Sequence, residues 1–332
     1  MLNPKLKLNT KIWNDDVEQV PIRKGFGQGL LKAGEENENV VGLCADLVES
    51  TQMNLFADKF PERFIEMGVA EQNLVTVASG MSAMGKIPFC TSYAMFSPGR
   101  NWEQIRTTIA YNDRKVVIVG SHSGISVGPD GGTHQALEDI ALMRVMPNMD
   151  VISPCDAIEA KKATLALVKT PKPAYLRLVR EKTQIITTEE TPFSLEKAEI
   201  YWMPDVGIAQ VGIIVTGGLM YKALLAAKEL EAEGIKTKVM NLAIIKPIDV
   251  GSVVALAKEC KAIVTVEEHQ VVGGMGSAVA ETLAQNFPVP MEFLGIQNKF
   301  GQSGTPDELI EHYGMGKDSI KEAVKKVFKR KI

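Results

Sequence analysis

The chain of 332 residues is 45% hydrophobic and 23% charged, and its formal net charge is -3 at pH 7. This composition is typical of folded globular proteins and excludes extended disorder, and the length exceeds that of one average domain. Because the charge is nearly balanced and no basic cluster is interleaved with aromatic residues, we expect two folded domains and no nucleic-acid partner.

The cysteines and the N-terminal segment indicate a cellular compartment. Cys44, Cys90, Cys155 and Cys260 stand singly in apolar or mixed segments, which favours buried free thiols in a reducing cytosol. Residues 1–16 carry charges throughout and lack the apolar core of a secretion signal. No apolar run approaches the ~20 residues that cross a bilayer. We therefore expect a cytoplasmic protein without a membrane partner.

Short β-branched runs alternate with longer helical patterns in the first half of the chain. We predict strands at residues 40–46, 63–68, 87–91, 115–121, 149–154 and 174–179, and helices at residues 71–84, 102–111, 136–146 and 157–168. This alternation predicts a parallel sheet covered by helices. Such sheets bind ligands at the carboxyl ends of their strands, and Asp46, Gly68 and His122 fall at such ends.

The periodicity fades in a segment rich in Thr, Glu and Pro, and a second alternating series follows it. We assign residues 15–185 to a first domain, residues 186–205 to a linker and residues 206–332 to a second, smaller domain. Both domains are predicted to be α/β, the first with a parallel sheet and the second with three layers.

Glu71 stands in GVAEQN, where a strand and the turn at Gly68 lead into a mostly apolar helix. A carboxylate at this place faces few groups that could solvate it. It could act on a ligand, or it could simply complement the positive N-terminal end of its own helix. The residue pattern alone leaves both interpretations open.

Two of the four histidines share the glycine-rich segment SHSGISVGPDGGTH, which also contains Asp130. The glycines allow backbone and imidazole groups to approach a ligand closely. We expect a helix to begin at Ala136, directly after His134, so that its N-terminus favours an anionic or oxygen-rich ligand. Ordinary hydrogen-bonded loop histidines are the alternative, and the segment lacks the further ligands that a metal site needs.

Aromatic and basic residues elsewhere are weaker candidates. Tyr93 and Phe96 could stack on a cofactor or belong to the core. Arg23 and Arg180 could each bind a phosphate or form a surface salt bridge. In the second domain, a Gly-Gly-x-Gly turn at residues 273–276 resembles an anion cradle, although such a turn is common. No P-loop, Gly-x-Ser-x-Gly or His-Glu-x-x-His motif is present.

The segments GVAEQN, PFCTSY with its following aromatic residue, SHSGISVGPDGGTHQ and LRLVR together resemble the pyrimidine-binding domain of transketolases. The likeness continues through the transketolase C-terminal domain. It implies that residues 15–185 bind the pyrimidine end of thiamine diphosphate. It also implies that Glu71 hydrogen-bonds the pyrimidine ring nitrogen and stabilises the imino form, which takes the proton of the thiazolium carbon.

The resemblance implies roles for the other candidates as well. Tyr93 and Phe96 would lie against the pyrimidine ring. His134 would act in catalysis and, with Asp130, would face the oxygen atoms of the donor sugar. Its phosphate would be held by four residues: Arg23, Ser50, His122 and Arg180.

The chain also departs from the pattern of full-length transketolases. It lacks their Gly-Asp-Gly sequence with a distant Asn, and PDGGTH is not an equivalent. The stretch SPGRNW after Phe96 differs from many relatives as well. We therefore expect that a separate partner subunit binds the diphosphate and Mg2+, that this chain holds no metal, and that it dimerises within an α2β2 assembly. The family reaction is transfer of a two-carbon ketol unit from xylulose 5-phosphate to ribose 5-phosphate in the pentose phosphate pathway.

Three alternatives share parts of this pattern. GVAEQ is also typical of 1-deoxyxylulose-5-phosphate synthases, but those have an Asp-Arg pair where this chain has Ser121 and His122. The β subunit of a 2-oxo acid dehydrogenase has a similar layout, yet Arg180 and the loop histidines suit a phosphosugar better than a lipoyl arm. A non-catalytic relative with the same fold is the third, and the presence of Glu71 argues against it.

Overall fold

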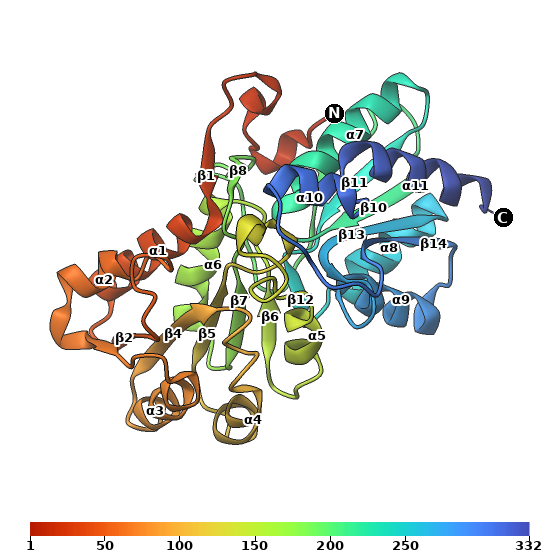
Figure 1. Ribbon diagram of the computed structural model, residues 1–332. Helices are drawn as coiled ribbons and strands as arrows, with labels where there is room; N and C mark the ends of the chain where they lie inside the picture. Colours follow the sequence, from red (N-terminus) through yellow and green to blue (C-terminus); the bar gives the residue numbers. More distant parts are fainter. Residues whose placement is uncertain (332) are drawn as a thin grey trace.

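The computed structural model describes residues 1–331 and contains two large sheets that lie side by side (Figure 1). The first sheet has seven strands in the order β12-β6-β7-β5-β4-β2-β3, and the second has five in the order β14-β13-β10-β11-β9. A two-stranded ribbon joins β1 (Gln19–Pro21) to β8 (Lys182–Gln184). The predicted fold class, two α/β domains, is confirmed.

Six strands of the first sheet run parallel and alternate with helices along the chain. The strands are β2 (Val40–Cys44), β3 (Phe64–Glu66), β4 (Ile87–Tyr93), β5 (Val117–Ser121), β6 (Asp150–Ile152) and β7 (Ala174–Arg177). The helices are α1 (Ile22–Glu36), α2 (Asn54–Lys59), α3 (Glu71–Ala83), α4 (Trp102–Gln104) with the π-helical η4 (Ile105–Ala110), α5 (Asp139–Arg144) and α6 (Ala157–Lys169). The central strands are buried on both faces, as expected for a covered parallel sheet.

Close packing of α1 on α6 depends on small residues. A Cβ atom added at Gly25 would lie 1.8 Å from the carbonyl oxygen of Ala157, so only glycine allows this approach. The side chain of Asp156 accepts a hydrogen bond from the backbone N–H of Glu159 and so caps α6. This pair of helices places Arg23, in the first turn of α1, near the carboxyl end of the sheet.

The segment after His134 differs from the predicted helix at residues 136–146. Only α5 is helical there, and it begins at Asp139. Ala136 instead forms an isolated parallel bridge with Ser123, and its carbonyl oxygen accepts a hydrogen bond from Gly124 N at 2.9 Å. Residues 122–136 therefore close into a loop, and no helix N-terminus directly follows His134.

The second domain has helices on both faces of its sheet, which makes the predicted three layers. Its strands are β9 (Glu199–Trp202), β10 (Val211–Val215), β11 (Thr237–Asn241), β13 (Ile263–Gln270) and β14 (Met291–Ile296). Its helices are α7 (Met220–Ala232), α8 (Val250–Cys260), α9 (Met275–Asn286), α10 (Pro306–His312) and α11 (Lys317–Lys329). Residues of α7 and α11 pack together in one core cluster, and residues of α8 and α9 belong to another. Strand β9 lies inside the segment predicted as linker, where it pairs antiparallel with β11 and forms a sheet edge.

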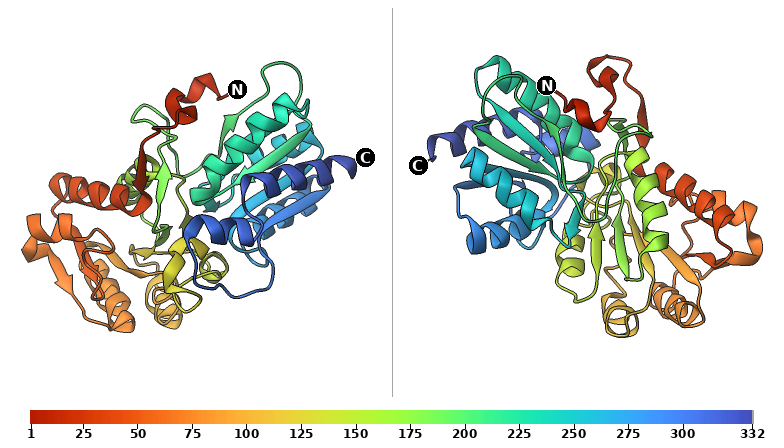
Figure 2. Two further views of the ribbon diagram at one scale, coloured as in Figure 1. Left: turned by 45° about the horizontal axis from the view of Figure 1, so that its top comes forward. Right: turned by 180° about the vertical axis from the view of Figure 1, so that it is seen from behind.

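The two domains share elements at their junction (Figures 1 and 2). Strand β12 (Ile244–Lys246) follows β11 in the chain but pairs antiparallel with β6 of the first sheet. At the other end of the chain, Leu6, Leu8 and Ile12 are buried in the core of the second domain. All four cysteines are free and buried, as predicted, and no helix within residues 1–331 is long and apolar enough to cross a membrane.

Candidate active site

The carboxyl ends of β2, β4 and β5 lie next to one another and carry polar side chains. These strands are neighbours in the sheet, and Asp46, Tyr93 and His122 stand at their ends. Asp46 and His122 have positive backbone φ angles of 56° and 53°. Such angles are uncommon for non-glycine residues and concentrate at functional sites. These residues therefore lie together at the strand ends where the sequence pattern predicts a ligand site.

Four rings gather at this edge of the sheet. The rings of Tyr93 and His122 are stacked, with 3.8 Å between their centroids. The ring of Phe96 lies nearly parallel to that of Tyr93 at 6.0 Å, and the ring of His134 stands edge-on to Phe96 at 5.5 Å. Together they form one continuous aromatic surface.

Two arginines meet beside these rings. Arg23 donates a hydrogen bond to the carbonyl oxygen of Arg180. Arg180 donates to the carbonyl oxygen of Val127 at 2.7 Å and lies 3.5 Å from the carboxylate of Asp130. Burial and the neighbouring charge of Arg180 lower the pKa of Arg23, and its Nε is buried without a hydrogen-bond partner in residues 1–331. Both arginines are candidates for binding an anion, although the carboxylates of Asp130 and, at 3.8 Å, Glu181 already lie beside Arg180.

His122 lies close to the same two arginines. It is buried, and the hydroxyl of Ser121 lies 2.9 Å from its Nδ1. Burial, followed by the charges of Arg23 and Arg180, lowers the pKa of His122 to about 3. His122 is therefore neutral at physiological pH.

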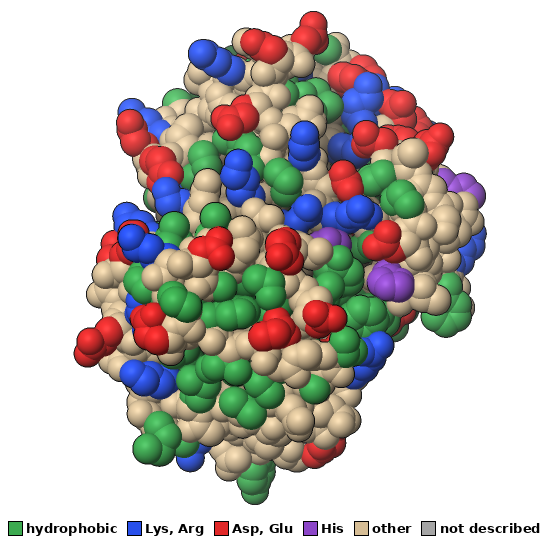
Figure 3. Space-filling model, turned by 60° about the vertical axis from the view of Figure 1, so that its left-hand side comes forward, with side chains coloured by type: hydrophobic (Ala, Val, Ile, Leu, Met, Phe, Trp, Pro, Cys, Tyr) green, Lys and Arg blue, Asp and Glu red, His purple; other side chains and the backbone are tan. Residues whose placement is uncertain are grey.

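On the face shown in Figure 3, basic side chains lie beside histidines and above a band of hydrophobic side chains.

Glu71 begins α3 and is only 4% exposed. Nη1 of Arg100 lies 3.1 Å and 3.2 Å from its two carboxylate oxygens. The guanidinium carbon of Arg100 in turn lies 4.3 Å from the ring centroid of Phe96. A cavity beside this pair is lined by residues 69–73 and by Arg100. A buried carboxylate next to an aromatic ring suits a planar heterocycle with N–H donors, because a planar guanidinium already fits between them.

The structure brings together most of the residues predicted for the site. Seven form the ring and arginine cluster: Arg23, Tyr93, Phe96, His122, Asp130, His134 and Arg180. Glu71 is joined to Phe96 through Arg100. Ser50 is half-buried in the turn after β2, and within residues 1–331 its side chain makes no hydrogen bond to the cluster.

Two supporting residues were missed in the sequence. Arg100 lies in SPGRNW, four residues after Phe96, a spacing that could have suggested contact in a turn. Glu268, from the second domain, accepts a hydrogen bond from Ser126 N at 2.5 Å and so holds the loop that carries Asp130. Nothing in the sequence indicates that a residue 142 positions away supports this loop.

The buried ion pair of Arg177 and Asp139 links the loop of residues 122–136 to the second domain. Arg177 Nε lies 2.7 Å from Asp139 Oδ2, and its Nη2 donates to the carbonyl oxygen of Glu268 at 2.8 Å. Both side chains are 1% exposed. An arginine at the end of a buried strand predicts such a partner, because an unpaired buried charge is very costly.

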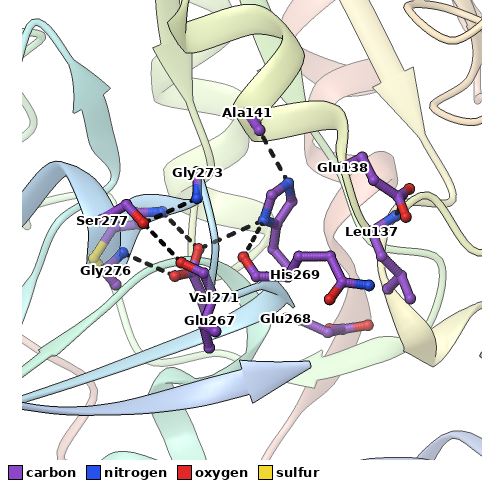
Figure 4. A network of polar contacts seen from close by, with 12 residues as sticks. Leu137, Glu138, Ala141, Glu267, Glu268, His269, Val271, Gly273, Gly276 and Ser277 are labelled. Atoms are coloured by element: carbon purple, nitrogen blue, oxygen red, sulfur yellow. Dashed lines mark hydrogen bonds and ion pairs between the residues drawn. The ribbon is translucent and has the colours of Figure 1, made fainter. Parts of the chain in front are cut away.

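The Gly-Gly-x-Gly turn of the second domain does not form an open anion cradle. The carboxylate of Glu267 accepts hydrogen bonds from Met275 N at 2.6 Å and from Gly276 N at 2.8 Å (Figure 4). The interpretation of this turn as an anion cradle was therefore wrong, because the side chain of Glu267 already accepts hydrogen bonds from these N–H groups. Burial raises the pKa of Glu267 to about 7, although the two N–H groups act in the opposite direction.

Comparisons with known proteins agree with this architecture. Residues 18–185 match the family model of the transketolase pyrimidine-binding domain, and residues 201–320 match that of the transketolase C-terminal domain. A protein of Methanocaldococcus jannaschii, named provisionally as a transketolase C-terminal section, is 42% identical over 93% of this chain and 96% of its own length.

Two further relatives are similar over nearly the whole chain. A 6-deoxy-6-sulfo-D-fructose transketolase subunit of Clostridium sp. (strain MSTE9) is 37% identical over 95% of this chain and 97% of its own length. A solved structure described as a split-gene transketolase, an inactive beta4 tetramer, superposes with a TM-score of 0.87 at 40% identity. It covers 94% of this chain and 100% of that one.

Proposed function

The chain belongs to the transketolase family, and from this premise we propose that it is the pyrimidine-binding subunit of a two-chain, thiamine-diphosphate-dependent transketolase. The observation that carries the proposal is the adjacency of two sites. A buried carboxylate beside an aromatic ring suits the aminopyrimidine, and a cluster of two arginines and a neutral histidine suits a phosphate.

When bound, thiamine diphosphate supplies the thiazolium that stabilises a carbanion. In this proposal Glu71 holds a proton at the pyrimidine ring nitrogen, and its burial limits proton exchange with solvent. Phe96 and Tyr93 orient the ring by stacking. His134 lies against these rings and would move or hold a proton at a hydroxyl oxygen of the sugar.

The phosphate of the sugar is assigned to the arginine cluster. Arg23 offers a buried Nε with no other partner in residues 1–331, and Arg180 lies directly beside it. The neutral His122 can donate or accept one hydrogen bond without adding charge. Asp130 holds Arg180 from the other side and would also meet the sugar. Ser50 stays a predicted phosphate ligand on the strength of the family resemblance.

We assign the diphosphate and Mg2+ to a separate partner subunit in an α2β2 assembly. Two relatives of similar length support this assignment, one named as a subunit and the other as a split-gene product. Within residues 1–331, no group of three or more His, Cys, Asp or Glu side chains is arranged to hold a metal ion. A cytoplasmic location is also part of the proposal, and the four free cysteines support it.

Xylulose 5-phosphate and ribose 5-phosphate, of the pentose phosphate pathway, are the proposed donor and acceptor. The relative that acts on a sulfo-sugar shows that the family accepts other anionic ketoses. The arginine cluster favours such anionic sugars over the substrates of a 2-oxo acid dehydrogenase, pyruvate and a lipoyl arm. Its two arginines can bind the terminal anionic group of the sugar.

A coupled assay of ketol transfer tests the proposal. It compares this chain alone, this chain with a diphosphate-binding partner, and the Glu71→Ala variant with the same partner, all with thiamine diphosphate and Mg2+. We expect turnover only in the wild-type pair and a loss on the order of 100-fold or more in Glu71→Ala, with assembly unchanged by sedimentation. Inactivity of a demonstrably assembled wild-type pair would refute the substrate assignment, and pyruvate with and without glyceraldehyde 3-phosphate would be assayed next.

A further inference from the structure

Arg100 is the one residue lining the Glu71 cavity that does not belong to residues 69–73. It follows Phe96 by one turn, and its backbone N–H donates to the Phe96 carbonyl oxygen at 2.9 Å. Its side chain is 51% exposed, whereas Glu71 is 4% exposed. A half-exposed cation therefore covers a buried carboxylate.

The two contacts of Arg100 are those expected of an aminopyrimidine at the same place. One guanidinium nitrogen reaches both oxygens of Glu71, at 3.1 Å and 3.2 Å. The guanidinium plane also lies over the ring of Phe96, with 4.3 Å from carbon to centroid. A guanidinium and an aminopyrimidine are both flat and both carry N–H donors, so they compete for the same carboxylate and the same ring.

We propose that Arg100 is an internal substitute for the cofactor's pyrimidine ring, and that it must leave Glu71 and Phe96 before thiamine diphosphate can bind. The inference rests on the proposed function, because it requires that the assembled protein binds this cofactor. Arg100 keeps the buried carboxylate of Glu71 paired while the chain has no cofactor.

The unequal burial of the two partners makes this exchange feasible. When the ion pair opens, Arg100 itself loses little, because its half-exposed guanidinium is already partly hydrated. Releasing Glu71 without a replacement would leave a buried carboxylate unpaired, which is strongly unfavourable. The ion pair of Arg100 and Glu71 therefore opens only when the aminopyrimidine replaces Arg100. The free energy needed to open the ion pair lowers the affinity for the cofactor.

The first experiment measures thiamine diphosphate binding to the assembled two-chain protein in the presence of Mg2+, by titration calorimetry. Arg100→Met keeps the length of the side chain but removes its charge and its hydrogen bonds. We expect the Kd to fall on the order of 3- to 30-fold in this variant. Arg106→Met is the matched control, because Arg106 is exposed in η4 and forms no ion pair within residues 1–331. Its Kd should equal that of the wild type.

The second experiment measures thermal unfolding of this chain without cofactor. Arg100→Met should lower the Tm, because Glu71 loses its partner, and the loss should disappear when Glu71→Gln is already present. If Arg100 only stabilised the fold, Arg100→Met would also lower the Tm, but it would not tighten cofactor binding. The opposite directions of the two effects therefore identify a competing internal ligand.

The outcomes separate this inference from the proposed function. If the wild-type assembly binds no thiamine diphosphate, the proposed function fails and the inference fails with it. If the wild type binds but Arg100→Met binds equally or more weakly, only the inference fails. Should Arg100→Met not fold, Arg100→Lys keeps the charge but loses the plane that stacks on Phe96. Tighter binding by Arg100→Lys than by the wild type supports the inference, and equal or weaker binding overturns it.

Discussion

Both domains place a glycine-rich segment after a parallel strand, but the two segments differ in the polar groups that surround them. In the second domain, Glu267 accepts hydrogen bonds from the backbone N–H groups that begin α9. In the first domain, Arg23 keeps a buried Nε without a partner in residues 1–331 and lies beside a second arginine. The glycines are alike in sequence, so a binding site is recognised by unsatisfied groups rather than by the motif.

The titration of the buried groups shows the same difference. In the first-domain cluster, burial and then the charges of Arg23 and Arg180 lower the pKa of His122 to about 3. In the second domain, burial raises the pKa of Glu267 to about 7, and no ligand is needed to complete its hydrogen bonds. Under the proposed function the first segment binds an anion from outside, whereas the N–H groups of the second already have Glu267 as their acceptor.

Within this comparison, removing a cation that lies beside the first segment should have the largest effect. Arg180→Met should lower kcat/KM for a phosphorylated donor about 100-fold, because a charge-assisted hydrogen bond to phosphate is lost. Steady-state kinetics of the assembled pair would measure this loss. Lys182→Met, which removes an exposed positive charge two residues away, should change kcat/KM less than about 3-fold. Equal losses of kcat/KM in both variants would mean that Arg180 acts only through the overall electrostatic potential of the surface and not by direct contact with the phosphate.

Removing the internal anion from the second segment should affect stability instead. Glu267→Gln leaves one of the two N–H groups at the start of α9 without an acceptor, which should lower the free energy of unfolding by about 2 kcal/mol. Urea unfolding of the chain would measure the change. The KM for the phosphorylated donor should stay within about 2-fold of the wild-type value in the assembled pair. A large rise in KM would show that the second segment also serves the ligand.

The pH dependence of stability should show the smallest effect. The pKa of His122 is about 3 in the folded chain, below its ordinary value of 6.5, so between these pH values the unfolded chain binds more protons. Stability from this group is complete above pH 6.5 and falls as the pH is lowered toward 3. His122→Gln should therefore lose less stability than the wild type between pH 6.5 and pH 4.5, by on the order of 1 kcal/mol.

Urea titrations at several pH values would measure this difference. The exposed His312→Gln variant should follow the wild-type curve, because its side chain lies outside the cluster. Parallel curves for His122→Gln and the wild type would show that burial and the arginines do not lower the pKa of His122.

Local sequence patterns were sufficient for most elements of the fold. The β-branched runs correspond to β2, β4, β5 and β7, and the predicted helix at residues 71–84 corresponds to α3. The helix predicted at residues 136–146 was too long, because the backbone of Ala136 bonds to residues 123 and 124 instead of continuing a helix. The helical periodicity of residues 136–146 gives no indication that residues 123 and 124 compete for the backbone groups of Ala136.

The sequence by itself determined the family, the two α/β domains, and most residues that the structure brings together at the ends of β2, β4 and β5. Such predictions depend on short-range patterns and on motifs that the chain carries intact. Only the tertiary structure decided which polar groups already have partners. It showed that Glu267 fills its own turn, that Glu268 supports the loop from the other domain, and that Arg100 covers Glu71. Pairing of charges depends on distance and burial in three dimensions, and neither quantity is encoded in the spacing of residues along the chain.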